Sequence, residues 1–118
     1  MRNFNNLEIW KISHKLTLRI YQVTLGFPKE ELFGLKSQMR RSSSSIPTNI
    51  AEGCGRFTNA DLKRFLTIAT GSCSELEYQL ILARDLNYIQ DIIFKELTTM
   101  VIQIRKMIHS YSSKLNVV

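Results

Sequence analysis

The chain has 118 residues, a formal net charge of +6 and a hydrophobic fraction of 44%. This length predicts a single domain over residues 1–118, the hydrophobic fraction excludes a disordered chain, and no apolar run reaches the ~20 residues that span a bilayer. The first residues lack the apolar region of a signal peptide, so we expect a cytoplasmic protein that does not associate with membranes.

The first predicted helix spans residues 7–25 and has two apolar stripes. At about 100° per residue, Ile9, Leu16 and Ile20 share one side, as residues facing a core do. The second stripe lies on nearly the opposite side, and soluble monomers rarely expose an apolar patch of that size. We therefore expect another subunit to cover it, with coverage by segments of the same chain as the alternative. The second stripe consists of Leu7, Trp10, His14, Leu18, Tyr21 and Leu25.

A row of basic side chains lies between these two stripes. Lys11, Lys15 and Arg19 follow one another at four-residue spacing, so they project from one edge of the helix. Residues 1–41 contain eight basic and three acidic side chains, which is most of the charge surplus of the chain. Such a surface attracts polyanions, although it also simply keeps a protein soluble. The row is therefore a candidate contact for nucleic acid.

The second predicted helix begins near Pro28 and ends at Gly53. Its apolar residues recur at helical spacing, with Pro47 inside the pattern. Because Pro47 cannot donate to the carbonyl of Ser43, we expect a kink between these two residues and not two separate helices. The hydroxyls of the serine run 42–45 are expected to satisfy carbonyl groups that the proline frees, and phosphorylation of this run is the alternative.

The third predicted helix starts after Thr58 as its N-cap and continues to about Leu86, and the fourth starts at Asp91. Gly71 lies mid-helix, where a glycine usually marks close packing by a neighbour, and Asn87 can end the helix in the left-handed conformation. Loops of about 2–6 residues make successive helices antiparallel. The predicted fold is an all-α, antiparallel up-down-up-down four-helix bundle with a proline kink in its second helix, assembling as a homo-oligomer.

No residue pattern typical of a catalytic or metal site occurs in the sequence. Nucleophile elbows, phosphate-binding loops and HExxH motifs are missing. Glu75 and Glu77 are two residues apart on a helix, so they point to different sides. His14 and His109 have no cluster of acidic or cysteine residues that would complete a metal site. We therefore predict a non-enzymatic protein without a cofactor or metal.

Several motifs form a long and specific signature. They are Leu7-x-x-Trp10, Gln38-Met39-Arg40-Arg41, Ser45-Ile46-Pro47-Thr48-Asn49-Ile50-Ala51-Glu52-Gly53, Gly55-Arg56, Phe65-Leu66-x-Ile68-Ala69-x-Gly71-Ser72 and Glu75-Leu76-Glu77-x-Gln79-Leu80. Through them the chain, from about residue 4 to residue 89, resembles the bacterial four-helix-bundle family of 23S-ribosomal-RNA intervening-sequence proteins. The resemblance implies a ring-like homopentamer. It also implies kinship with the accessory protein of diversity-generating retroelements, which binds nucleic acid and a reverse transcriptase through a basic surface.

Two functions are compatible with the charge distribution and the resemblance. The first is a non-catalytic accessory protein that binds structured RNA or DNA by shape and charge. The second is an interaction scaffold that docks a protein partner such as a reverse transcriptase without binding nucleic acid. Arg40 and Arg41 fit phosphate contacts and a structural role equally, whereas Asn49 and Glu52 are expected to be structural. The candidate nucleic-acid contacts are Lys11, Lys15, Arg19, Lys36, Arg40, Arg41 and Arg56.

Overall fold

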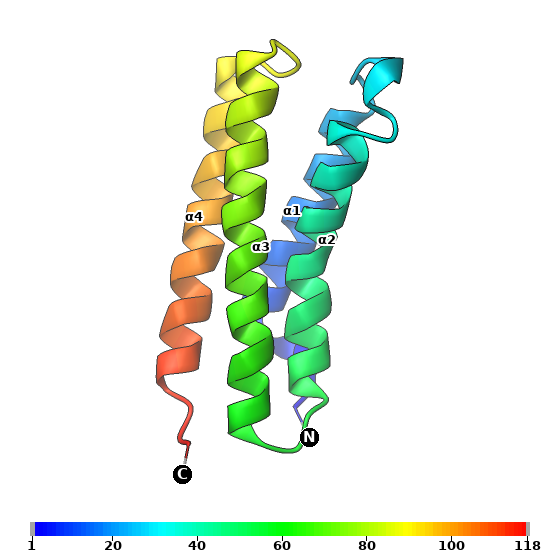
Figure 1. Cartoon of the computed structure of the whole chain (residues 1–118). Coiled ribbons are helices and arrows are strands. Elements are labelled where there is room, and N and C mark those ends of the chain that lie inside the picture. Colours follow the sequence, from blue (N-terminus) through cyan, green and yellow to red (C-terminus); the bar gives the residue numbers. More distant parts are fainter. Residues whose placement is uncertain (1, 118) are drawn as a thin grey trace.

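A computed structural model describes residues 2–117 as four long helices in a body with extents of 48 × 23 × 21 Å (Figure 1). Two short 3₁₀ helices precede the first two of them, and no strand occurs within the described residues. The predicted all-α four-helix bundle is therefore confirmed. The elements are η1 (Phe4–Asn6), α1 (Glu8–Thr24), η2 (Lys29–Glu31), α2 (Leu35–Cys54), α3 (Asn59–Asp85) and α4 (Asp91–Ser113).

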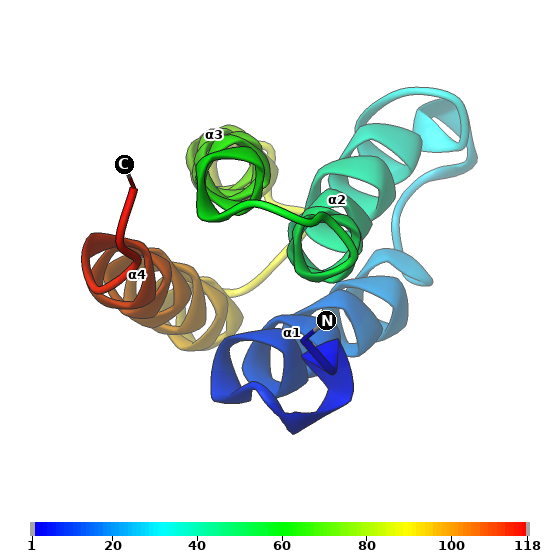
Figure 2. The same cartoon turned by 90° about the horizontal axis from the view of Figure 1, so that it is seen from below.

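The four helices form a bundle in which α1 and α3 stand at diagonal corners (Figure 2). Both α1 and α3 pack against α2 and α4, and within residues 2–117 the backbones of α1 and α3 do not approach each other closely. Helices α1 and α3 run in the same direction and α2 and α4 in the opposite one (Figure 1). Arg2 donates a hydrogen bond to the side chain of Asn59, so α1 and α3 start at the same end of the bundle.

The core is built from the apolar side that helical spacing predicts for each helix. The α3 stripe that runs from Leu62 to Ala83 is buried along its whole length. On α1, the hydroxyl residues Ser13, Thr17 and Thr24 are buried as well. Ser13 and Thr24 each donate to a backbone carbonyl three or four residues earlier, and the single Thr17 hydroxyl proton is shared between the carbonyls of Ser13 and Ser43, which satisfies these buried polar groups without interrupting the helix.

Helix α2 continues through Pro47, and a hydroxyl on α1 replaces the hydrogen bond that the proline cannot make. The Thr17 hydroxyl donates to the carbonyl of Ser43 at 3.0 Å. The Ser43 and Ser44 hydroxyls instead donate to carbonyls one turn earlier in α2, so the expectation that the serine run itself satisfies this carbonyl is wrong. Sequence spacing along α2 does not reveal which α1 side chain crosses it. The kink at Pro47 stays a prediction.

Helix α2 begins at Leu35, later than the predicted start near Pro28. Pro28 precedes the short η2, and the chain turns at Gly34 before α2 begins. The Glu31 carboxylate accepts a hydrogen bond from the Leu35 N–H at 3.1 Å, which satisfies a backbone donor at the start of the helix. The predicted start was wrong because the fixed φ of proline suits a short 3₁₀ turn as well as the first turn of an α-helix.

Two predicted helix signals are confirmed and one glycine prediction is wrong. The Thr58 hydroxyl accepts from a backbone N–H of the first turn of α3, and Asn87 ends that helix with a φ of 63°. Gly71, however, is exposed, and no atom lies within 4 Å of the position that a Cβ would occupy. Close packing occurs at Gly53, where a Cβ would lie 2.7 Å from Leu62 Cδ1.

Candidate interaction surface

The basic row predicted on α1 is largely neutralised by neighbouring carboxylates. Arg19 donates two hydrogen bonds to Glu96 of α4, at 2.7 and 2.9 Å, and Lys11 Nζ lies 3.4 Å from the Glu8 carboxylate. The hydrogen bonds from Arg19 lower the pKa of the Glu96 carboxyl, so this pair stays charged. Within residues 2–117, Lys15 is the one member of the row without a carboxylate partner.

Three other predicted contacts lie together on α2, where Lys36, Arg40 and Arg41 line one hollow of about 410 Å³. We call these three residues the basic cluster. None of them forms an ion pair with a carboxylate of residues 2–117, so their charges are not neutralised by the fold. The other residues that line the hollow are Tyr21, Leu32, Ser37 and Ser44.

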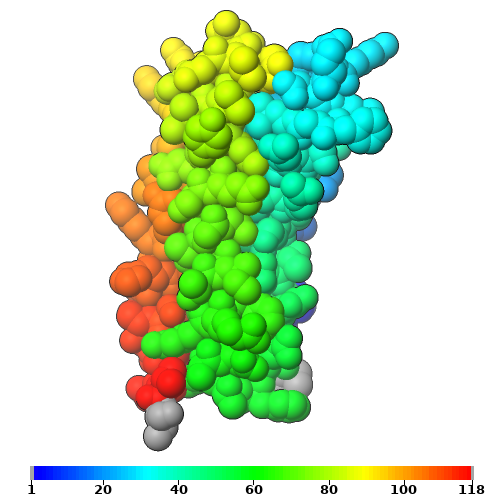
Figure 3. All heavy atoms as spheres, viewed as in Figure 1, coloured from blue at the N-terminus to red at the C-terminus, as the bar shows by residue number. Residues whose placement is uncertain are grey.

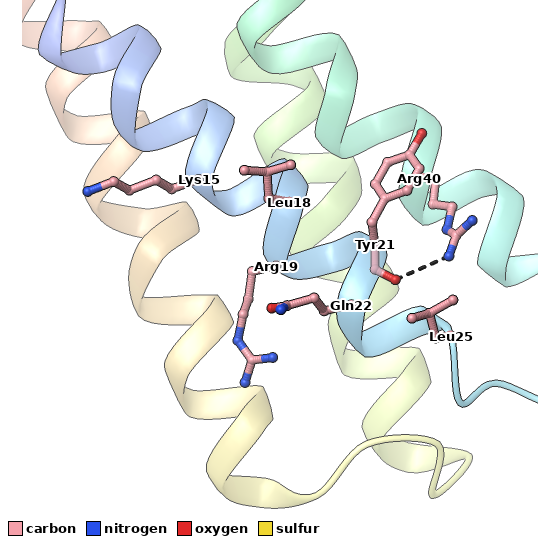
Figure 4. A pocket seen from close by; sticks show the side chains of 7 residues that line it. All are labelled: Lys15, Leu18, Arg19, Tyr21, Gln22, Leu25 and Arg40. Atoms are coloured by element: carbon pink, nitrogen blue, oxygen red, sulfur yellow. Dashed lines mark hydrogen bonds between the residues drawn. The ribbon is translucent and has the colours of Figure 1, made fainter.

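Arg40 is held in position by uncharged groups of α1. Its Nε donates to the Thr24 hydroxyl at 2.9 Å, and its Nη2 donates to the backbone carbonyl of Tyr21 at 3.1 Å, the dashed line in Figure 4. The guanidinium also lies 4.4 Å from the centroid of the Tyr21 ring, in a cation–π contact. Arg40 is therefore oriented without losing its charge. Arg41, one residue further, is exposed.

The remaining predicted contact, Arg56, lies apart from the basic cluster. It follows the C-terminal end of α2, whereas the basic cluster lies in the first two turns of that helix. The Arg56 guanidinium packs over the ring of Phe65 at 4.7 Å, and Arg64 packs over the same ring at 4.8 Å. The structure therefore brings three of the seven predicted contacts together in one hollow, places Lys15 and Arg19 with Arg40 in a second one, and separates Arg56 from both.

The second apolar stripe of α1 divides into a covered and an open part. Near the start of the helix, the Trp10 ring meets Phe4 of η1 edge to face at 5.0 Å and stacks on His14 at 5.1 Å. Leu7 and Trp10 are half-buried, while His14 is exposed. A segment of the same chain therefore covers part of the stripe, which is the alternative that the sequence left open.

The open part consists of Leu18, Tyr21 and Leu25, which we call the α1 outer stripe. Leu18 is 54% exposed and Leu25 is 71% exposed. Figure 4 shows these residues along one side of α1, where they contribute the apolar part of a hollow of about 680 Å³. This hollow therefore combines an apolar floor with a cationic rim. Its other lining residues are Lys15, Arg19, Gln22 and Arg40.

Polar residues of the signature join α2 to α3. Asn49 Nδ2 donates to the carbonyl and the hydroxyl of Ser45, at 2.8 and 2.9 Å, and the Ser45 hydroxyl lies 2.8 Å from that of Ser72. Asn49 thus fixes a contact between the helices, while the exposed Glu52 side chain makes no hydrogen bond within residues 2–117. Sequence reasoning missed Gln79, a polar residue on the core stripe of α3 that accepts from the Ser42 hydroxyl at 2.6 Å.

Reactive and metal-binding groups do not gather in the described part of the chain. Cys54 and Cys73 are both buried, and burial raises the pKa of the Cys73 thiol to about 11, which disfavours the reactive thiolate. Among residues 2–117, no three histidine, cysteine or acidic side chains lie close enough together to hold a metal ion. No helix in this range is long and apolar enough to cross a membrane.

Comparison with known proteins identifies relatives of the same fold. A family model described as 23S rRNA-intervening sequence protein matches residues 5–110. A crystal structure of a protein of unknown function from the S23 ribosomal protein family of Bacteroides thetaiotaomicron is similar, with a TM-score of 0.80 and 26% sequence identity. That match covers 90% of this chain and 99% of the other. No curated protein sequence matches the chain.

Proposed function

Because the chain belongs to the family of 23S rRNA-intervening sequence proteins, we propose that it is a non-catalytic, homo-oligomeric protein of the cytoplasm that binds structured RNA or DNA. The family description names an RNA, and three cations on α2 line one hollow without carboxylate partners in residues 2–117. Binding of this kind relies on charge and shape, since the chain has no motif that reads base edges.

The basic cluster is the observation that carries this proposal. No carboxylate of the described residues forms an ion pair with Lys36, Arg40 or Arg41, so their positive charges are not offset by a neighbouring negative charge. Phosphate groups bind such a surface by Coulomb attraction and by release of condensed counterions. Ser37 lines the same hollow, and its hydroxyl can donate a hydrogen bond to a phosphate oxygen. The predicted row on α1 contributes less, because Glu96 and Glu8 already pair with two of its members.

Assembly strengthens a surface that is weak in one subunit. Three cations per subunit give low affinity at physiological salt, but an oligomer presents the basic cluster several times. After the first contact, further contacts to the same nucleic acid are intramolecular, so the overall affinity rises steeply with the number of clusters that reach it. The proposal therefore includes a preference for long, folded RNA or long duplexes over short ones.

A second candidate function is an interaction scaffold for a protein partner, for example a reverse transcriptase. It is favoured by the hollow in front of α1, where exposed Leu18 and Leu25 form an apolar floor. Protein interfaces commonly combine such an apolar centre with a charged rim. This function does not require direct contact with nucleic acid.

A binding titration separates the two functions. Fluorescence anisotropy with a labelled, folded RNA at ~50 mM salt, repeated at rising salt, measures the affinity and its salt dependence. Nucleic-acid binding predicts measurable affinity at low salt and a linear fall of log K with log salt. If the protein does not bind long folded RNA or duplex DNA at ~50 mM salt, this proposal is wrong and the scaffold becomes the better account.

A further inference from the structure

Helix α3 carries an exposed stripe on the side opposite its core-facing side. At about 100° per residue, Ile68, Gly71, Glu75 and Tyr78 fall within about 80° of one another, on the solvent-facing side of the helix, with Ile68 at its edge next to buried Gln79. Ile68 is 44% and Tyr78 is 61% exposed. We call these four residues the α3 outer stripe. Figure 3 views the bundle from the side where α3, in green, forms the middle of the surface.

Nothing within the subunit explains the glycine in this stripe. Gly71 lies in the interior of a 27-residue helix, where glycine is less favourable than alanine. It has a negative φ and no atom within 4 Å of a Cβ position, so neither backbone conformation nor internal packing requires it. A glycine between two exposed apolar side chains leaves a shallow gap over the helix backbone. Such a gap accommodates a closely approaching side chain from another molecule.

We propose that the α1 outer stripe of one copy packs against the α3 outer stripe of the next copy, head to tail. This inference rests on the homo-oligomer of the proposed function, and it specifies the two surfaces through which neighbouring subunits contact each other. Both faces are apolar and exposed, and their charges are complementary. Lys15 borders the α1 outer stripe, whereas Glu75 lies within the α3 outer stripe. Within residues 2–117, Glu75 accepts a hydrogen bond from Gln79 at 3.3 Å and pairs with no cation.

The positions of the two faces in the bundle permit head-to-tail assembly. Helices α1 and α3 are diagonal, so their outward sides face in opposite directions, and each copy can contact two neighbours through different surfaces. Both helices start at the same end, and at about 1.5 Å per residue Tyr21 and Gly71 each lie ~20 Å from that end. Successive copies therefore need little shift along the long axis when these two faces meet.

Two complementary variants test this arrangement. Leu18→Glu blocks the α1 outer stripe and Tyr78→Glu blocks the α3 outer stripe. Both side chains are more than half exposed in the subunit, so circular dichroism is expected to show unchanged helix content. Light scattering should give each variant alone the subunit mass of 13.7 kDa. A 1:1 mixture should give a dimer of twice that mass and nothing larger, because each dimer retains one intact interface.

Three results would overturn the inference or its premise. If the mixture stays monomeric while the wild type is an oligomer, the two stripes do not meet and the homo-oligomer stands without this interface. If Tyr78→Glu keeps the wild-type mass, the α3 outer stripe is not part of an interface. If the wild type itself is monomeric at micromolar concentration, the homo-oligomer and this inference both fail, while the RNA titration still tests nucleic-acid binding separately.

Two further variants serve as controls. Ile92 on α4 is 72% exposed and belongs to neither stripe, so Ile92→Glu should keep the wild-type mass. A Cβ at position 71 has no neighbouring helix within 4 Å, so Gly71→Leu should keep the helix content, yet weaken assembly at least tenfold as measured by sedimentation at decreasing concentration. Unchanged assembly of Gly71→Leu would contradict the close approach at Gly71.

Discussion

The Thr17 hydroxyl of α1 donates to the carbonyl of Ser43 at 3.0 Å, and this is the carbonyl that Pro47 leaves without its helical donor. One side chain therefore joins α1 to α2 and supplies the missing hydrogen bond of a proline inside a helix. The contact explains how α2 continues from Leu35 to Cys54 without interruption. It also keeps the basic cluster, which lies in the first two turns of α2, in a fixed position relative to α1.

A double-mutant cycle measures this relationship. Thr17→Val keeps the shape of the side chain but leaves the buried Ser43 carbonyl unpaired, so the free energy of unfolding should fall by about 1–3 kcal/mol. In the Pro47→Ala background, the new backbone N–H at position 47 can pair with the same carbonyl, and Thr17→Val should cost less. Urea unfolding measures the free energy of unfolding of the wild type, the two single variants and the double variant. An equal cost in both backgrounds would show that Thr17 does not compensate for Pro47.

The contacts of Glu31 predict a specific loss of stability in acid. The hydrogen bond from the Leu35 N–H, followed by that from the Tyr88 hydroxyl at 2.8 Å, lowers the pKa of the Glu31 carboxyl. Because the pKa of Glu31 is lower in the folded state than in the unfolded state, where it is about 4.3, the ionised carboxylate stabilises the fold at pH values above 4.3. This stabilisation is lost as the pH falls through the pKa of the folded state. The thermal midpoint of Glu31→Gln should therefore fall less than that of the wild type between about pH 6 and pH 3. Glu30→Gln is the matched control and should retain the wild-type pH dependence.

Close packing at Gly53 predicts a strong effect of one methyl group. A Cβ at Gly53 would lie 2.7 Å from Leu62 Cδ1 and 3.0 Å from Phe65 Cβ, so Gly53→Ala should destabilise the fold by about 1–3 kcal/mol. Gly26 has open space around it and a negative φ, and Gly26→Ala should be neutral or slightly stabilising. Thermal unfolding of the two variants compares them directly. Similar midpoints for both would contradict the packing at Gly53.

Sequence periodicity predicted the structural features that depend on a single helix. The core stripe of α3, the cap at Thr58 and the left-handed end at Asn87 follow from local spacing and backbone preference, and all three are confirmed. The exposed side of α1 at Leu18 and Leu25 was recognised for the same reason.

Contacts between helices distant in the sequence were not predictable in this way. Arg19 and Glu96 are 77 positions apart, and only the packing of α4 beside α1 reveals that the carboxylate neutralises the predicted row. Gly71 illustrates the same limit. A glycine inside a helix indicates that a neighbour could approach closely, but the sequence does not show whether that neighbour belongs to the same subunit, and here no neighbouring helix does so. All three residues of the basic cluster were among the predicted contacts, but only the fold shows that they lack carboxylate partners while two members of the α1 row have them.

The most direct test of nucleic-acid binding compares two double variants that remove the same charge. Lys36→Gln with Arg41→Gln removes two unpaired cations and spares Arg40, whose hydrogen bonds hold it against α1. Lys11→Gln with Arg19→Gln removes two cations that already pair with carboxylates. Both variants lower the formal net charge by two, so they differ only in which surface loses it.

The measurement is the slope of log K against log salt for a long B-DNA duplex, with helix content and mass checked for both variants. The slope of the α2 variant is expected to fall by about 0.9 for each phosphate contact removed per bound subunit, and this variant should bind more weakly at ~50 mM salt. The α1 variant should stay close to the wild type. Equal losses in the two variants, or an unchanged slope in the α2 variant, would contradict the claim that the basic cluster binds nucleic acid.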